Sequence, residues 1–125
     1  MTTNSYAIGS VSGGNESSVG GLVGETMGQI YTSYSTGAVS GGTSSLVGGF
    51  AGNDDDAIIQ NSYWDTTTSG TEDGTGAGNV SGLTGLTSQQ LQSGLPDGFD
   101  PAIWAQDANI NNGFPYLIAN SPTRK

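Results

Sequence analysis

The run Asp54–Asp56 is the one place in the chain where three carboxylates adjoin, and carboxylate oxygens are ligands that Ca²⁺ prefers. A calcium loop also needs a defined spacing, such as Asp-x-Asp-x-Asp-Gly followed at a distance by Glu. The segment "NDDDAIIQ" (53–60) lacks this spacing and differs from the nonapeptide calcium repeat. We therefore interpret Asp54, Asp55 and Asp56 as a solvated turn and predict no metal site, with calcium binding as the alternative.

Three more acidic residues lie close together further along the chain. Asp65, in "YWDTTTSG" (63–70), is expected to accept hydrogen bonds from the backbone that follows it, as in an Asx turn. A ligand role for Asp65 is the alternative. Glu72 and Asp73 are interpreted as solvated.

Few side chains of this sequence could act as a catalytic nucleophile or base, because the chain contains neither histidine nor cysteine. Most pairings of a nucleophile with a base are therefore excluded, as are disulfides and cysteine zinc sites. Adjacent carboxylates on one turn do not converge on one bond, and an acidic polysaccharide would meet a net charge of −9. We predict a protein that is not an enzyme, without catalytic residues or a cofactor. A hydrolase or lyase is the weakest alternative.

The charge distribution also limits the partners. The only cations of the sequence are Arg124 and Lys125, at its C-terminal end. The rest of the chain has no group to neutralise phosphates or anionic lipid. No apolar run is long enough to span a membrane, and the N-terminus lacks the layout of a signal peptide. We expect no nucleic-acid partner and no membrane insertion.

The sequence contains an internal repeat, and the fold of this repeat determines where the acidic residues lie. The stretch "SYAIGSVSGGNESSVGGLVG" (5–24) returns as "SYSTGAVSGGTSSLVGGFAG" (33–52), with Ser33 in the place of Ser5 and Gly52 in the place of Gly24. A third copy begins one position late at "IIQNSYWD" (58–65), so the turn 53–57 must absorb the insertion. Each unit has too few apolar residues to bury its own core, which indicates a stacked array.

The units consist of short β-branched and aromatic runs separated by Gly, Ser and Asn, so each is a set of short strands. At roughly 3.3 Å per residue, one unit traces about 90 Å, which is enough for one circuit of a three-sided solenoid. Paired glycines suit its corners, where φ is positive or the backbone approaches closely. Parallel stacking then aligns like residues in ladders: Tyr6, Tyr34 and Tyr63; Val11 and Val39; Val19 and Val47; Leu22 and Phe50.

We therefore predict an all-β, right-handed parallel β-solenoid (β-helix) of two and a fraction circuits, closed by an irregular C-terminal cap with one short helix. The hand follows from the general preference for right-handed crossovers. A β-sandwich or small barrel is the alternative. The period ends after Gly70, which divides one continuous structural domain into repeats at 1–70 and a closing region at 71–125.

The closing region begins with the stretch 71–82, which has little to bury and is predicted as a loop. Thr87 as N-cap together with Gln90 forms a capping box for the short helix, and Gly94 is expected to end it in left-handed geometry. Further on, "NNG" (111–113) predicts the turn of a capping hairpin.

A solenoid end exposes apolar core and unpaired strands unless another segment covers it. We predict that the largest apolar side chains form the core of a cap over that end, with Leu86 and Leu91 against the open strand edge. An exposed aromatic platform for carbohydrate is the alternative. The residues of this group are Trp64, Phe99, Trp104, Phe114, Tyr116 and Leu117.

Several of these motifs together resemble a known family. "VGGLVG" (19–24) and its degenerate copy "VGGFAG" (47–52), each preceded by "SYxxGxVSGG", resemble the GLUG repeat of large secreted bacterial proteins. These include filamentous-haemagglutinin-like adhesins and some cell-wall-anchored peptidases. The later "NSYWDTTTSG" (61–70), "GLTSQQLQ" (85–92) and "FDPAIWAQDANINNGFPYL" (99–117) resemble the segment that closes a run of such repeats. The second copy departs from the pattern at Phe50 and Ala51.

The resemblance implies an extracellular or bacterial cell-surface setting and contact with adjacent repeats of a longer parent chain, and it carries no catalytic residue into this segment. We expect a structural stalk or terminal capping module of an adhesin-like protein. The alternative is a module that binds a host, matrix or carbohydrate ligand, or adheres through calcium, by way of the loop 71–82 or the acidic turn.

Two further expectations concern surfaces. Thr36 and Thr66–Thr68 hint at an ice-binding face, but Ile8 stands where the first repeat should match Thr36. Because Met1 is followed by the middle of a repeat, we expect an excised fragment whose open first circuit pairs end to end with a second copy.

Overall fold

The computed structural model describes residues 1–78 and 81–122. These residues are rich in strands and include one short α-helix, and the sheets they form are parallel except for one hairpin near the C-terminus. This confirms an all-β class with parallel sheets.

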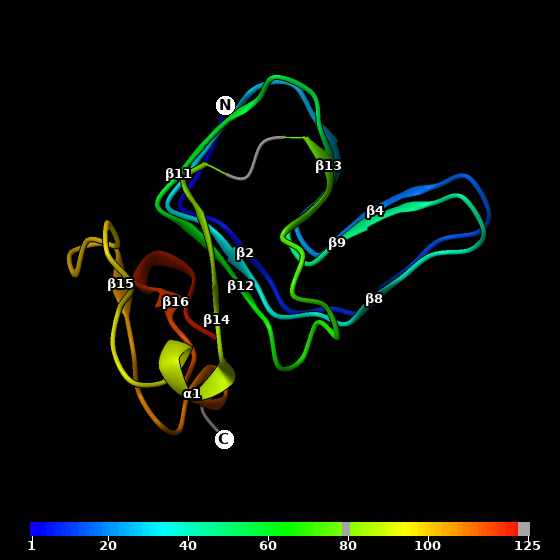
Figure 1. Cartoon of the computed structure of the whole chain (residues 1–125). Helices are drawn as coiled ribbons and strands as arrows, with labels where there is room; N and C mark the ends of the chain where they lie inside the picture. The colour runs from blue at the N-terminus through cyan, green and yellow to red at the C-terminus, as the bar shows by residue number, and fades with distance from the viewer. Residues whose placement is uncertain (79–80, 123–125) are drawn as a thin grey trace.

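The strands follow one another in successive circuits of the chain, each lying on the previous one (Figure 1). The first circuit contains β1 (Thr2–Thr3), β2 (Tyr6–Ala7), β3 (Val11–Ser12), β4 (Ser18–Gly20) and β5 (Val23–Thr26). The second contains β6 (Gln29–Tyr31), β7 (Tyr34–Ser35), β8 (Val39–Ser40), β9 (Leu46–Gly48) and β10 (Ala51–Asp54). The third contains β11 (Ile58–Gln60), β12 (Ser62–Asp65) and β13 (Thr75–Gly78), and β14 (Leu83–Leu86) lies on the third.

The register of these strands agrees with the repeat. Tyr6 lies beside Tyr34 and Tyr34 beside Tyr63, while Val11 pairs with Val39 and Val19 with Val47. The N–H of Leu22 donates to the carbonyl of Phe50, its ladder partner. Each predicted ladder is therefore confirmed.

The extra residue of the third copy also lies where the sequence places it. Before the turn Asp54 pairs with Thr26, and after it Ile58 pairs with Gln29. The offset between partner strands therefore grows by one position across the turn between β10 and β11. The insertion falls in this turn, as predicted.

Circuits one and two share a feature that circuit three lacks. In each of them the chain leaves the body after β2 or β7, runs outward through β3 or β8 and returns through β4 or β9 (Figure 1). We call this two-layered projection, residues 8–20 and 36–48, the arm. The third circuit turns back within residues 66–74 and has no arm.

The prediction of a loop at 71–82 is wrong in part, because Thr75–Gly78 forms β13 and pairs with β10. Small residues allow this close approach, since a Cβ on Gly76 would lie 2.6 Å from the carbonyl oxygen of Gly52 in β10 and 2.5 Å from the nitrogen of Val47 in β9. Asn79 and Val80 of this prediction lie outside the described residues. With β14 added, the stacked strands extend past Gly70 to Leu86, beyond the expected two and a fraction circuits.

Alternation along the strands divides the apolar residues between two cores. In β12, Trp64 points into the stack and joins a core with Ile30, Phe50 and Ile59. Its neighbour Tyr63 points to the opposite face of the sheet, as the period of two requires.

The part of the closing region that follows β14 packs on that opposite face, and the name closing region is used for this part from here on. Its elements are α1 (Ser88–Leu91), β15 (Trp104–Ala105), η1 (Asn111–Gly113), β16 (Tyr116–Leu117) and η2 (Ile118–Asn120). Leu91, Phe99 and Trp104 form the second core with Tyr34 and Tyr63 of the ladder. These elements lie beside the stack and not across its end (Figure 1), so the prediction of an end cap is wrong for them and for Leu91. The outward-facing tyrosines explain this position, because they offer the apolar surface that the closing region needs. Leu86 does lie against the open strand edge, as predicted, because β14 pairs with β12.

The local predictions for this region have mixed outcomes. The capping box of Thr87 and Gln90 is present. The helix ends at Gln92 in right-handed geometry, before Gly94 is reached, so the left-handed glycine cap is wrong. The hairpin is confirmed, since β15 and β16 pair antiparallel across the Asn111–Gly113 turn.

Candidate functional site

The acidic turn is less solvated than the sequence predicts. Asp55 and Asp56 are exposed, but Asp54 is only 4% exposed. One carboxylate oxygen of Asp54 accepts a hydrogen bond of 2.8 Å from the N–H of Ala57, which is itself buried. The solvated-turn interpretation is therefore wrong for Asp54, whose side chain closes the turn.

Burial raises the pKa of Asp54 above its ordinary value, and the neighbouring Asp56 and Asp55 raise it further. The hydrogen bond from Ala57 acts in the opposite direction. Because the folded-state pKa is the higher one, the folded chain binds a proton more readily than the unfolded chain. Stability therefore rises as the pH falls through the folded-state pKa, and this gain levels off below the ordinary value.

We expect Asp54→Asn to remove this gain, because the amide keeps the oxygen that accepts from Ala57 but does not titrate. The measurement is urea unfolding across the mildly acidic range for the wild type, Asp54→Asn and the exposed control Asp73→Asn. An unchanged pH dependence in Asp54→Asn would contradict the assignment.

The carboxylate of Asp65 is used in hydrogen bonds inside the protein. It is fully buried, and its Oδ1 accepts from the N–H groups of Thr67 and Thr68 at 2.8 and 3.1 Å. Its Oδ2 accepts from the hydroxyl of Ser88, the first residue of α1, at 2.5 Å. The Asx turn is confirmed, and the same carboxylate joins the stack to the closing region.

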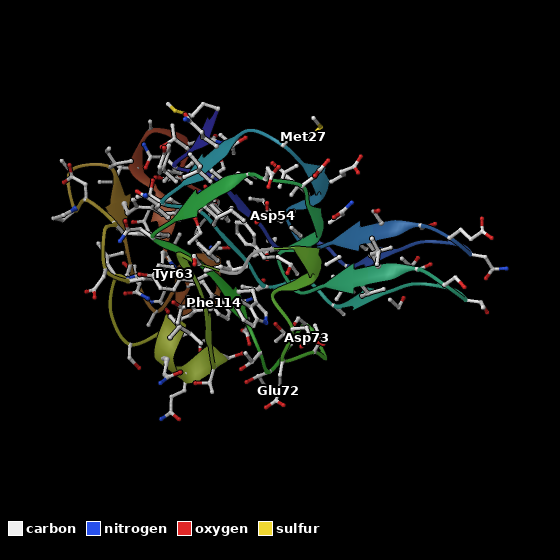
Figure 2. The ribbon with its side chains drawn as sticks, turned by 45° about the horizontal axis from the view of Figure 1, so that its top comes forward. Met27, Asp54, Tyr63, Glu72, Asp73 and Phe114 are labelled. Atoms are coloured by element: carbon white, nitrogen blue, oxygen red, sulfur yellow. The ribbon has the colours of Figure 1, made fainter. Side chains whose placement is uncertain are left out.

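The other acidic residues singled out from the sequence are Glu72 and Asp73. Glu72 and Asp73 are exposed, as expected, and lie at another corner of the molecule from Asp54 (Figure 2). Within residues 1–78 and 81–122, no three acidic, histidine or cysteine side chains come together in a way that would hold a metal ion.

The aromatic residues do not form an exposed platform. Phe99, Trp104, Phe114 and Leu117 belong to or pack against the core of the closing region, as predicted. Trp64 belongs to the core of the stack, where its Nε1 donates to the carbonyl of Thr71 at 3.2 Å. Tyr116 is half-buried and lies in neither core.

The threonines also fail to build a regular outer face. Thr36 is buried, and its carbonyl accepts from the hydroxyl of Thr68. The hydroxyl of Thr66 donates to the carbonyl of Leu86. These groups are used in joining circuits.

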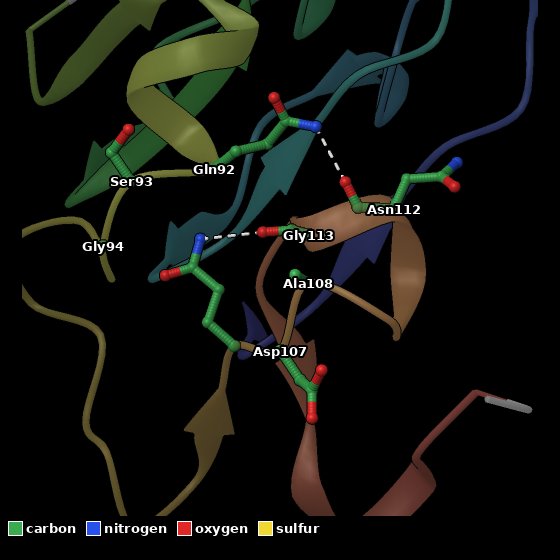
Figure 3. A pocket seen from close by; sticks show the side chains of 8 residues that line it. Gln92, Ser93, Gly94, Asp107, Ala108, Asn112 and Gly113 are labelled. Atoms are coloured by element: carbon green, nitrogen blue, oxygen red, sulfur yellow. Dashed lines mark hydrogen bonds between the residues drawn. The ribbon is translucent and has the colours of Figure 1, made fainter. Parts of the chain in front are cut away.

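A hollow of about 420 Å³ lies in the closing region, between the end of α1 and the Asn111–Gly113 turn (Figure 3). The Nε2 of Gln92 donates to the carbonyl of Asn112 at 2.7 Å, and that of Gln106 donates to the carbonyl of Gly113 at 3.0 Å. The Nε2 of Gln106 also donates to the carbonyl of Leu91 in α1 at 2.5 Å, so the two amide groups tie the helix to the turn. Sequence reasoning missed the hollow, because its lining comes from separate short turns with no common motif.

Comparison with family models, with curated proteins and with solved structures finds no match for this chain. In the part of the chain that the structure describes, no helix has the length and apolar character needed to cross a bilayer.

Proposed function

We propose that the chain is a non-catalytic structural module that ends a right-handed parallel β-solenoid in a longer, surface-exposed, adhesin-like protein. Its N-terminal end receives preceding circuits of the parent chain, and its C-terminal region terminates the stack. The observation that supports this proposal concerns equivalent glycines of the two circuits. Glycines of the second circuit lie in close contact with the first circuit, whereas no described residue packs closely on their first-circuit counterparts.

Five strand edges lie together at the N-terminal end. Each first-circuit strand, from β1 to β5, pairs with the second circuit alone. Such edges offer unpaired N–H and C=O groups to a further strand, and natural proteins protect them with charged residues or proline. Residues 1–28 contain no proline and only Glu16 and Glu25 as charged side chains.

The glycines specify what fits this end. A Cβ on Gly37 would lie 1.9 Å from the carbonyl oxygen of Gly9, and a Cβ on Gly42 would lie 2.3 Å from the Oδ1 of Asn15. Both residues must be glycine because the first circuit packs directly on them. Their first-circuit counterparts, Gly9 and Gly14, have no atom of the described residues within 4 Å of the same position. A preceding circuit of the same kind would pack on Gly9 and Gly14 and would explain why both positions are glycine.

We expect Gly37→Ala to lower the free energy of unfolding by roughly 2–3 kcal/mol, since the clash is with backbone. Gly9→Ala should be neutral or slightly stabilising, because its Cβ would meet open space and φ there is not positive. Urea unfolding of both variants measures the difference. Equal losses at the two positions would contradict the argument.

The proposed function is tested by placing one more copy of residues 1–28 ahead of the chain. The added unit should raise the midpoint of thermal unfolding in a single transition, and Gly9→Ala should now destabilise like Gly37→Ala. An added unit that stays unfolded, as judged by circular dichroism, would overturn the proposal.

Termination is supported by the shortening of the last circuits. Tyr34 pairs with Tyr63, whereas Tyr63 pairs with Thr84, which follows it much sooner along the chain. The arm is lost at the same point, and the closing region then covers the tyrosine ladder from the side. A host, matrix or carbohydrate ligand, calcium-dependent adhesion and an end-to-end dimer through the first circuit stay predictions.

A further inference from the structure

A second hollow, of about 350 Å³, lies between the base of the arm and the η1 turn of the closing region. Ile8 and Ser10 line it where the first circuit leaves the body, and Asn111 and Phe114 line it from the closing region. Its volume falls within the roughly 300–1,000 Å³ of small-ligand sites. The second hollow is therefore large enough to hold a small molecule.

This hollow adjoins the first one, which lies between the end of α1 and the same turn. Asn112 lines both hollows. Figure 3 shows Asn112 at the edge of the first hollow, with its side chain directed away from Gln92. The two hollows thus meet at the turn, and we call them together the groove. The groove extends from the end of α1 to the base of the arm.

Two amide side chains of the groove are fixed in orientation by the protein. The Nδ2 of Asn111 donates to the hydroxyl of Tyr34 at 3.1 Å and to the carbonyl of Pro115 at 3.0 Å. The Nε2 of Gln106 likewise donates to two backbone carbonyls. An amide nitrogen carries two hydrogens, so both amides have used their donors. Neither the Oδ1 of Asn111 nor the Oε1 of Gln106 accepts a hydrogen bond from a described residue, so each is left to accept from a ligand.

The groove also offers apolar surface and hydroxyl groups. Phe114 packs against the second core but is only half-buried, and Ile8 is 56% exposed. Ser10 and Thr68 add exposed hydroxyl-bearing side chains to the second hollow. The second hollow has no charged side chain in its lining, and the first has only Asp107. A neutral ligand that has both apolar faces and hydroxyl groups matches this lining.

We infer that the groove binds a neutral oligosaccharide. A sugar ring has C–H groups on its faces, which pack on aromatic and aliphatic side chains, and hydroxyls around its rim, which donate to fixed acceptors. Phe114 and Ile8 supply the apolar contact, and Asn111 and Gln106 supply the acceptors. The net charge of −9 disfavours an acidic saccharide.

The groove differs from the ligand sites named from the sequence. Neither the loop 71–82 nor the acidic turn contributes to its lining. The inference goes beyond the proposed function and does not rest on it, because the groove is built by the closing region and the base of the arm and not by the first-circuit edge.

Titration of the ¹⁵N-labelled chain with neutral trisaccharides, followed by NMR, tests the inference. The probes are maltotriose, cellotriose and triacetylchitotriose, each taken to tens of millimolar. We expect saturable shifts at Ser10 and at residues 111–114 with at least one of them. Because the groove is open and small, the expected Kd is about 1 mM.

Two substitutions fill the groove without adding an aromatic face. Ser10→Leu occupies the second hollow and Ala108→Leu the first, and both positions are exposed, so the fold should tolerate them. Ser12→Leu is the matched control, exposed and outside the lining. We expect at least about tenfold weaker binding in the two filled variants and wild-type binding in the control. The midpoint of thermal unfolding of each variant checks that it folds.

Several outcomes would overturn the inference. These are an absence of saturable shifts with all three saccharides, shifts confined to the acidic turn or to the loop 71–82, and an equal loss of binding in Ser12→Leu. Wild-type affinity in either filled variant would also overturn it. So would shifts in the groove with the diamine putrescine and none with the saccharides, because the fixed acceptors would then serve an ammonium group.

Discussion

Trp104→Ala is expected to lower the free energy of unfolding by roughly 3–5 kcal/mol, the range for removing a fully buried large aromatic side chain. Trp104 is 1% exposed and stacks on Phe99 with ring centroids 4.4 Å apart. It also contacts Tyr6 and Tyr34 of the ladder at 5.8 and 5.9 Å. Its removal therefore weakens the closing region and its attachment to the stack together.

Urea unfolding of Trp104→Ala, followed by the fluorescence of the remaining Trp64, measures this loss. Because Tyr34 and Tyr63 share a core with the closing region, Trp64 in the stack should report the same transition as circular dichroism. Two separate transitions, or a loss below about 1 kcal/mol, would show that the closing region does not stabilise the stack.

Trp104→Phe separates packing from polarity at the same position. Among the described residues, the Nε1 of Trp104 is the buried side-chain nitrogen or oxygen without a hydrogen-bond partner. Phenylalanine keeps an aromatic ring and removes this unsatisfied N–H, which offsets part of the lost packing. We expect Trp104→Phe to cost much less than Trp104→Ala. Tyr116→Ala, on the paired strand but outside the core, is the control.

The stacking could be predicted because each ladder repeats one residue type at a fixed interval. The pairs of Tyr6 with Tyr34 and of Val19 with Val47 needed no knowledge of which face was inside. Predicting the position of the closing region did require knowing which face of the sheet is the interior. Tyr63 and Trp64 are adjacent aromatic residues, so their alternation indicates opposite faces without saying which face is the interior.

Two other features lie outside what the sequence pattern indicates. One left-handed corner recurs in all three circuits and is occupied by Asn4, Thr32 and Asn61 (φ 50°, 48° and 50°), and further turns have Glu16, Ser44 and Asp56 in this conformation; none of these positions is one of the paired glycines. The glycines of the repeat serve close approach instead, as at Gly37. Strand β13 was missed because its sequence "TGAG" has no apolar alternation, and only its place beside β10 makes it a strand.

For the acidic residues, too, the sequence predicts some hydrogen bonds and not others. The Asx turn at Asp65 follows from local sequence, since its two backbone partners, Thr67 and Thr68, come shortly after it in the chain. The bond from Ser88 joins groups far apart in the sequence and requires the fold. Asp54 likewise looks solvated in a run of three aspartates, and its burial depends on the corner between β10 and β11.

Asp65→Ala is expected to lower the free energy of unfolding by roughly 2–4 kcal/mol, because a fully buried carboxylate accepts three hydrogen bonds. The alanine leaves the hydroxyl of Ser88 and the N–H groups of Thr67 and Thr68 without this acceptor. The turn that ends β12 and the start of α1 should loosen together, since one side chain holds both.

Thermal unfolding of Asp65→Ala, Ser88→Ala and Asp73→Ala separates the two parts of this effect. Ser88→Ala removes only the bond between the stack and the closing region, so it should cost less than Asp65→Ala. Asp73→Ala is an exposed control with the same loss of charge and should change little. If Asp65→Ala and Asp73→Ala shifted the midpoint equally, the effect would come from net charge, and Asp65 would not join the stack to the closing region.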